Sequence, residues 1–305
     1  MTTDLPRWRH CDVVNYDYHQ EKPYRLWRGP PITAGKHIII LVHGAVVPLL
    51  GKLHDLTKIN NDRYGFYDLD SLLYHDFHYN VFTFEYADIP IISPTGNVLG
   101  YVNYGDLIEY GKRLIEAIGF AKEKSKMQDG VVGPVTIIAH SMGGLVARCA
   151  AKIAAGTISK IITLDTGHCG FGLANFVDNI LKSAGVALPS GISCSKEVEE
   201  RSDLIKNLYS VFNPDNPKLV SLAATEPVDI PSLVGVPPPP VPIQITVVGL
   251  HSSSMMQVYD NGQPTTINYK IPFYPLHYSH VTITQITSDN CQAHEAYQKI
   301  KESLQ

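Results

Sequence analysis

The sequence predicts an α/β fold in which a mostly parallel central sheet is flanked by helices. Short apolar runs rich in β-branched residues indicate strands that are buried on both faces. Segments with helical periodicity separate these runs, and this alternation favours parallel strands joined by right-handed crossovers. The expected strands cover 37–43, 79–86, 135–140 and 158–165, and the expected helices cover 68–75, 104–126, 142–155 and 291–304.

Shorter segments between these elements are expected to form a hairpin and a loop. Alternating apolar residues within 10–30 predict an antiparallel hairpin at the edge of the sheet. Residues 88–102 are rich in Pro, Gly and Ile and predict a long loop. That loop either lines a substrate groove or packs its isoleucines on the body of the protein.

The alternation of strands and helices breaks after about residue 170. Apolar stripes within 173–184 and 198–211 predict two helices, and a third short helix is expected near 218–224. Four consecutive prolines at 237–240 predict a stiff extended segment. The apolar run at 242–250 then predicts a further core strand.

Ser141 lies where the expected strand 135–140 meets the following helix. A nucleophilic serine needs such a tight turn, because its hydroxyl must stand clear of the backbone for substrate to approach. Ala139 and Gly143 are the small residues that this strained turn requires, and Gly144 lets the helix pack closely on the strand. The alternative is a serine that merely caps an ordinary helix.

The motif A-H-S-M-G-G at 139–144 resembles the nucleophile elbow of α/β-hydrolases, above all of lipases and esterases with alanine at its first position. The H-G-A turn at 43–45 resembles the H-G-x turn of the same family. The resemblance implies that Ser141 is the nucleophile and that the backbone N–H groups of Ala45 and Met142 form the oxyanion hole. The histidine of the H-G-A turn is expected to have a structural role.

The resemblance extends to the general base. The segment S-H-V-T-I at 279–283 resembles the S-H-x-x-I element that precedes the closing helix of several lipase-like hydrolases. This implies that His280 takes the proton of the serine. His277 lies close by, and His294 is expected inside the closing helix, where a surface role is more common.

Two aspartates compete for the acid of the triad. Asp165 ends the expected strand 158–165, at the same edge of the sheet as the serine turn, as in lipases that resemble the pancreatic type. Asp260 follows the expected strand 242–250, but V-Y-D-N-G at 258–262 is typical of a hairpin turn, which by itself explains an aspartate. Asp165 is the preferred acid and Asp260 the alternative.

The same resemblance gives the domain organisation. Residues 1–170 and 242–305 are expected to form one α/β-hydrolase core, interrupted by a helical insertion over 171–241. In the resembling family an insertion at this place is a cap or lid above the active site. The alternative is an additional helical layer without a gating role, since apolar helical stripes usually indicate core.

Composition excludes several other classes of protein. The chain has 305 residues, 44% of them hydrophobic, and 25 basic against 29 acidic residues without a basic cluster, which argues against nucleic acid as a partner. Five scattered cysteines show no C-x-x-C pair, and thirteen histidines show no H-E-x-x-H spacing, so we expect neither a disulfide framework nor a metal site. The first residues lack the features of a signal peptide, and we expect a cytoplasmic protein, a mature secreted form being the alternative.

The resemblance thus predicts a carboxylic ester hydrolase that works through an acyl-enzyme without a cofactor. Its expected partner is a small-molecule or lipid ester, with transient contact to a lipid interface. An amidase or a thioesterase could use the same residues. A catalytically silent hydrolase-like binding or scaffold protein is a second class of function, because a fold alone does not imply activity.

Overall fold

The computed structural model describes most of the core of the chain. The described residues are 13–14, 25–28, 31–45, 65–86, 89–92, 98–103, 105–170, 203–211, 218–226, 228–229, 244–245, 258–260, 263–265 and 271–305. Among them, no helix is both long enough and apolar enough to cross a membrane.

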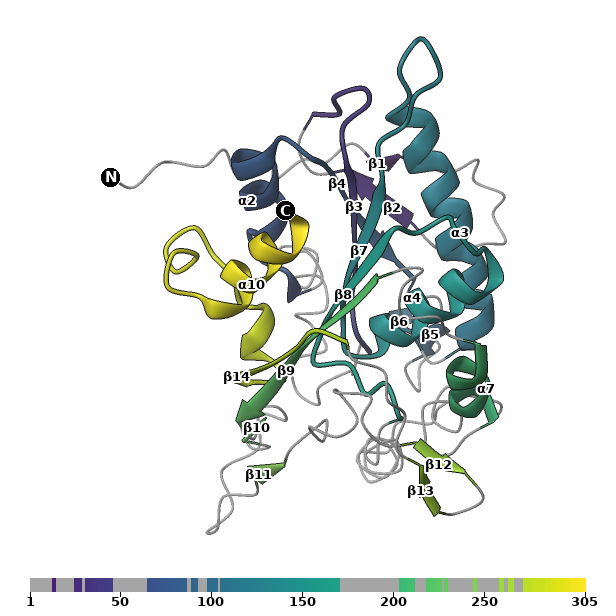
Figure 1. Ribbon diagram of the computed structural model, residues 1–305, viewed down its shortest axis with the longest axis vertical. Coiled ribbons are helices and arrows are strands. Elements are labelled where there is room, and N and C mark those ends of the chain that lie inside the picture. Colours follow the sequence, from purple (N-terminus) through teal and green to yellow (C-terminus); the bar gives the residue numbers. More distant parts are fainter. Residues whose placement is uncertain are drawn as a thin grey trace.

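The centre of the molecule is an eight-stranded sheet in the order β1-β2-β4-β3-β7-β8-β9-β14 (Figure 1). The six strands from β4 to β14 are parallel to one another, and β1 and β2 add an antiparallel edge. The strands are β1 (Val13–Val14), β2 (Arg25–Arg28), β3 (Ile38–Val42), β4 (Asn80–Glu85), β7 (Val135–His140), β8 (Lys160–Leu164), β9 (Lys218–Glu226) and β14 (Phe273–Ser279). The predicted mostly parallel sheet and its edge hairpin are confirmed.

Helices cover both faces of the sheet (Figure 1). On one face α3 (Leu107–Lys124), α4 (Met142–Ile153) and α7 (Asp203–Val211) pack against one set of strand side chains, and on the other face α2 (Leu69–Phe77) and α10 (Glu295–Leu304) pack against the alternate set. In β3, for example, Ile38 and Ile40 face the first layer while Ile39 and Leu41 face the second. This burial on both faces explains the unbroken apolar runs in the sequence.

The helix that leads into β7 begins with a side-chain cap. Asp106 precedes α3, and its carboxylate accepts a hydrogen bond from the backbone N–H of Glu109 at 2.9 Å. Such a bond satisfies one of the N–H groups that a helix start leaves without an internal partner.

One predicted loop is a hairpin instead. Residues 88–102 contain β5 (Ile89–Ile92) and β6 (Val98–Val102), which pair with each other antiparallel. The β-branched residues favour strand, and Pro90 is tolerated because, among the described residues, this ribbon has only two strands and both are edge strands. The reading of this segment as a loop is therefore wrong.

The predicted helix at 218–224 is also wrong, because β9 (Lys218–Glu226) lies there between β8 and β14. Its residues from Leu219 to Ala224 are buried. Periodicity cannot separate such a short apolar run from a buried helix. β9 belongs to the main sheet, although it falls within the insertion predicted over 171–241, and the bounds of that insertion stay a prediction.

The expected core strand at 242–250 is not part of the main sheet in the described residues. Its described portion, β11 (Gln244–Ile245), pairs antiparallel with β10 (Val228–Asp229) in a separate ribbon. The helix predicted within 198–211 is confirmed by α7, whereas the stripe at 173–184 lies outside the described residues. A cap or lid formed there stays a prediction.

Candidate active site

Ser141 has the backbone conformation expected of a strained strand-to-helix turn. It stands between β7 and α4 with φ 54° and ψ −127°, a left-handed region that a serine rarely adopts. Its carbonyl accepts hydrogen bonds from the Gly144 N–H at 3.1 Å and from the Thr166 hydroxyl at 2.9 Å. Its side chain makes no capping hydrogen bond to the helix, so an ordinary capping role does not account for it.

Close packing explains the small residues after the serine. A Cβ atom on Gly143 would lie 2.4 Å from the carbonyl oxygen of His43, and one on Gly144 would lie 2.2 Å from the Thr166 hydroxyl oxygen. Both distances are far below a normal contact, so this turn requires glycine at both positions. Ala139 is fully buried within β7.

Asp165 lies directly after β8 and is held by the backbone of β9. Its own N–H donates to the carbonyl of Leu222 at 2.7 Å, and its Oδ1 accepts the N–H of Ala224 at 3.1 Å. Its φ of 47° is the second left-handed conformation of a non-glycine residue at this edge of the sheet. The carboxylate is thereby buried in a fixed orientation.

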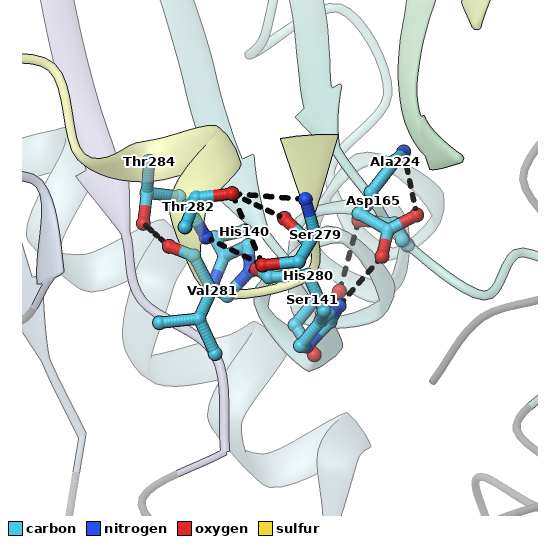
Figure 2. A network of polar contacts seen from close by, with 10 residues as sticks. His140, Ser141, Asp165, Ala224, Ser279, His280, Val281, Thr282 and Thr284 are labelled. Carbon is cyan, nitrogen blue, oxygen red and sulfur yellow. Dashed lines mark hydrogen bonds and ion pairs between the residues drawn. The ribbon is translucent and has the colours of Figure 1, made fainter. Parts of the chain in front are cut away.

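His280 follows β14 and contacts this aspartate. Its Nδ1 lies 2.7 Å from Asp165 Oδ2, and Figure 2 shows Asp165 joined to both Ala224 and His280. Only 14% of the His280 side chain and 2% of the Asp165 side chain are exposed. Because the carboxylate accepts, Nδ1 donates, and Nε2 of the imidazole is left to accept a proton.

The loop that carries His280 is fixed from two sides. The Ser279 N–H donates to the Thr282 hydroxyl at 2.9 Å, and the Thr282 N–H donates to the Ser279 hydroxyl at 3.2 Å. His140, which directly precedes Ser141, has its Nε2 2.9 Å from the His280 carbonyl oxygen. The two imidazole rings lie 4.6 Å apart, which brings His280 against the serine turn (Figure 2).

The other candidate residues lie elsewhere. His277 contacts Glu226 at 3.3 Å, with 87% of its side chain exposed. His294 is the residue before α10 and makes no side-chain hydrogen bond to the helix start. It is buried and stacks on Tyr278 at 4.4 Å between ring centroids, so the expected place inside the helix with a surface role is wrong. Asp260 ends β12 (Val258–Asp260), which pairs with β13 (Gln263–Thr265), and this confirms the predicted hairpin.

One of the two expected backbone donors directly follows the serine, and the other lies next to Gly44. Met142 is the first residue of α4, and Ala45 is in the segment after β3. Gly44 abuts the serine, since a Cβ atom on it would lie 2.8 Å from Ser141 Cβ. Residues after β3, β7, β8 and β14 thus meet at the carboxyl edge of the parallel sheet, where open α/β sheets place their sites.

Solved structures with a similar fold cover most of the chain. Phospholipase PlaB from Legionella pneumophila matches 88% of this chain and 59% of its own length, with a TM-score of 0.54 and 18% identity. Lipase BlEst2 from Bacillus licheniformis matches 85% of this chain and 92% of its own length, with a TM-score of 0.50 and 12% identity. The chain has the α/β-hydrolase fold. The predicted fold class is confirmed.

Sequence comparisons match parts of the chain to a domain family and to lipases. A model of the PGAP1-like alpha/beta domain matches residues 36–177. Triacylglycerol lipases from Pseudarthrobacter phenanthrenivorans and Burkholderia plantarii are each 31% identical over 86 residues, or 28% of this chain. The matched segment covers only 23% and 21% of those lipases. The predicted resemblance to lipases and esterases is confirmed.

Two histidines near Ser141 have a lowered pKa. Burial lowers the pKa of His43 to about 4. Burial and the neighbouring His280 lower the pKa of His140 well below its ordinary value. Near neutral pH, both rings therefore act as fixed hydrogen-bonding groups, which agrees with the structural role expected of His43.

Three residues that contact the site were not predicted from the sequence. Ala224, whose N–H binds Asp165, lies in a segment that was expected to be a helix. His140 and Thr166 bind the backbone carbonyls of His280 and Ser141, and a sequence does not indicate such partners. Only their positions next to Ser141 and Asp165 in the sequence could have suggested them.

No group of three or more potential metal ligands occurs within the part of the chain that the structure describes. The expectation that the protein needs no metal and no cofactor stays a prediction.

Proposed function

We propose that this protein hydrolyses carboxylic esters through a Ser141-His280-Asp165 triad. The observation that carries the proposal is the buried 2.7 Å contact between His280 and Asp165 beside a serine in a strained turn. A histidine oriented by a carboxylate, next to a serine in a strained turn, is the arrangement that activates a hydroxyl.

In the first half of the proposed reaction, Ser141 Oγ attacks the ester carbonyl while His280 Nε2 takes the hydroxyl proton. Asp165 keeps the Nδ1–H of the imidazole in place and stabilises its positive charge. The N–H groups of Ala45 and Met142 bind the oxyanion. The intermediate collapses to an acyl-serine, and the alcohol leaves with the proton from His280.

In the second half, His280 takes a proton from water as the water attacks the acyl-serine. The same N–H groups bind the second oxyanion. The carboxylic acid then leaves, and the proton returns from His280 to Ser141 Oγ. His280 takes part in each proton transfer of this cycle, and water is the only reactant besides the ester.

Lipid esters are the proposed substrates. The support comes from the names of similar proteins, which include triacylglycerol lipases and a phospholipase. Two residues of the site are compatible with an apolar substrate, because Ala45 and Val281 are exposed beside the serine turn and the base.

Hydrolysis of p-nitrophenyl esters of increasing acyl-chain length, with and without an oil interface, tests this proposal. Ser141→Ala should lower kcat by roughly 10⁴-fold or more, because no second nucleophile stands in the turn. Ser125→Ala is the matched control, since Ser125 is a buried serine at the end of α3, near the opposite edge of the sheet. Its kcat should equal that of the unmodified protein.

Two outcomes would overturn the proposal. Well-folded protein without activity on any ester would favour a binding or scaffold role. Faster turnover of the matching p-nitroanilides or thioesters would move the protein to the amidases or thioesterases.

A further inference from the structure

The peptide that joins Gly44 to Ala45 is held by two donors at a single oxygen. The Gly44 carbonyl lies 2.8 Å from Nδ1 of His43 and accepts a 2.9 Å hydrogen bond from Nδ2 of Asn103. A carbonyl oxygen has two lone pairs, so both are used. This oxygen is therefore fixed in direction as well as in position.

The first donor is itself rigid. Because His43 Nδ1 donates to a carbonyl, its Nε2 accepts, and the N–H of Tyr86 reaches it at 3.4 Å. The Tyr86 hydroxyl donates to the His43 carbonyl at 2.6 Å, and the two rings stack with centroids 4.4 Å apart. His43 thus holds one tautomer and one orientation.

The second donor comes from a distant part of the chain. Asn103 follows β6 and is fully buried, yet its side chain reaches back 59 positions to Gly44. A buried amide group is costly unless it is hydrogen-bonded, so its orientation is specified. The amide ties the β5–β6 segment to the turn after β3.

Because the peptide bond is planar, fixing the Gly44 carbonyl also fixes the direction of the Ala45 N–H. In a planar trans peptide, the C=O of one residue and the N–H of the next point in opposite directions. The Gly44 carbonyl points towards buried donors, so the Ala45 N–H points the other way, away from His43 and Asn103. Gly44 itself abuts Ser141.

We propose that Asn103 is a positioning residue of the oxyanion hole, which keeps the Ala45 N–H aimed at the developing oxyanion through the Gly44 carbonyl. This inference rests on the proposed ester hydrolysis. Without the amide, the Gly44–Ala45 peptide loses one of two restraints and rotates more freely. Pre-organised donors contribute to catalysis because they need no reorganisation during the reaction.

The test compares Asn103→Leu with the unmodified protein. Asn103→Leu should lower kcat by roughly 10- to 100-fold, a part of the loss seen when an oxyanion donor is removed. KM should change less than threefold. The affinity for a trifluoromethyl ketone, which forms an oxyanion with the serine, should fall by the same factor as kcat/KM.

Asn80→Leu is the matched control. Asn80 is an equally buried asparagine with two hydrogen bonds to the backbone of Thr33, at the amino end of β4 and so at the opposite edge of the sheet. Its loss should lower the melting temperature but leave kcat and the affinity for the ketone unchanged. A structural role alone would make the two variants alike.

The result that would overturn the inference is a folded Asn103→Leu with the kcat and ketone affinity of Asn80→Leu. If Asn103→Leu does not fold, Asn103→Ala, which introduces no bulk, is judged by the same criteria. Failure of the proposed function is distinguishable, because the unmodified protein would then hydrolyse no ester.

Discussion

Asp165 Oδ2 and His280 Nδ1 lie 2.7 Å apart, although the two residues are separated by 115 positions in the chain. The sheet brings them together, because β9 lies between β8 and β14 and each residue directly follows its strand. The next acidic position along this edge, Glu226 at the end of β9, contacts the exposed His277 instead. The geometry therefore favours an acid after β8.

Replacing each aspartate by asparagine should show which of the two is the acid of the triad. Asp165→Asn should lower kcat by roughly 10³-fold or more, because the amide cannot stabilise the imidazolium and favours the wrong tautomer. Asp260→Asn should change kcat less than threefold. Steady-state hydrolysis of a p-nitrophenyl ester measures both, and a loss confined to Asp260→Asn would refute the assignment of the acid.

His140 should position the base through the His280 carbonyl. His140→Leu removes the 2.9 Å hydrogen bond at that carbonyl and should lower kcat by roughly 10- to 100-fold, since small displacements of a reacting group are costly. His140→Gln keeps an N–H donor and should retain most of the activity. Equal kcat values for the two variants would show that this hydrogen bond does not matter.

Gly144 should be intolerant of even a methyl group. Gly144→Ala would place Cβ 2.2 Å from the Thr166 hydroxyl, and it should lower the free energy of unfolding by about 1–3 kcal/mol through overpacking. Gly119→Ala in α3 is the control, because no atom lies within 4 Å of its added Cβ. That variant should be stabilised by about 0.5–1 kcal/mol, since alanine favours helix over glycine. Urea denaturation measures both, and an unaffected Gly144→Ala would contradict the close packing.

Acid should destabilise the fold through two histidines, His37 and His43, whose pKa is lowered in the folded protein. Burial lowers the pKa of His43 to about 4, and burial together with Lys160 lowers that of His37 to about 4. The ordinary pKa is 6.5, so between pH 6.5 and 4 the unfolded chain binds more protons than the folded chain. The free energy of unfolding therefore falls as the pH falls through this range.

Urea denaturation at pH 7.5, 6.5, 5.5 and 4.5 measures this dependence. His37→Gln should flatten it, because one of the groups that take up a proton on unfolding is then missing. His37 lies at the amino edge of the sheet, where its Nε2 is 2.8 Å from the Thr136 hydroxyl oxygen. An identical pH dependence in His37→Gln would rule out this contribution.

The sequence predicted those parts of the fold that local patterns determine. The apolar run at 37–43 corresponds to β3, because a strand that is buried on both faces has apolar residues at every position. The apolar stripe within 104–126 corresponds to α3, because a helix that is buried on one face has apolar residues at helical spacing. The turn at Ser141 was predictable because only small neighbours permit its backbone angles. The preference for Asp165 followed from the edge at which parallel strands end.

The errors arose where pairing between distant segments decides the structure. The run at 218–226 contains leucine and alanine, which also suit a helix. It is a strand because it pairs with β8 and β14, and the pattern of its own residues does not indicate this pairing. The hairpin at 89–102 forms through pairing of two short segments. The contact of Asn103 with Gly44 joins residues from two such segments, so the sequence alone gave no signal for it.

Labelling with a fluorophosphonate tests the central claim most directly. The account predicts that the intact mass rises by one phosphonyl group, that the modified peptide carries it on Ser141, and that His280→Ala slows the labelling by orders of magnitude. Ser141→Ala should remain unlabelled. Folded protein that does not react, or that reacts at another serine, would contradict the account.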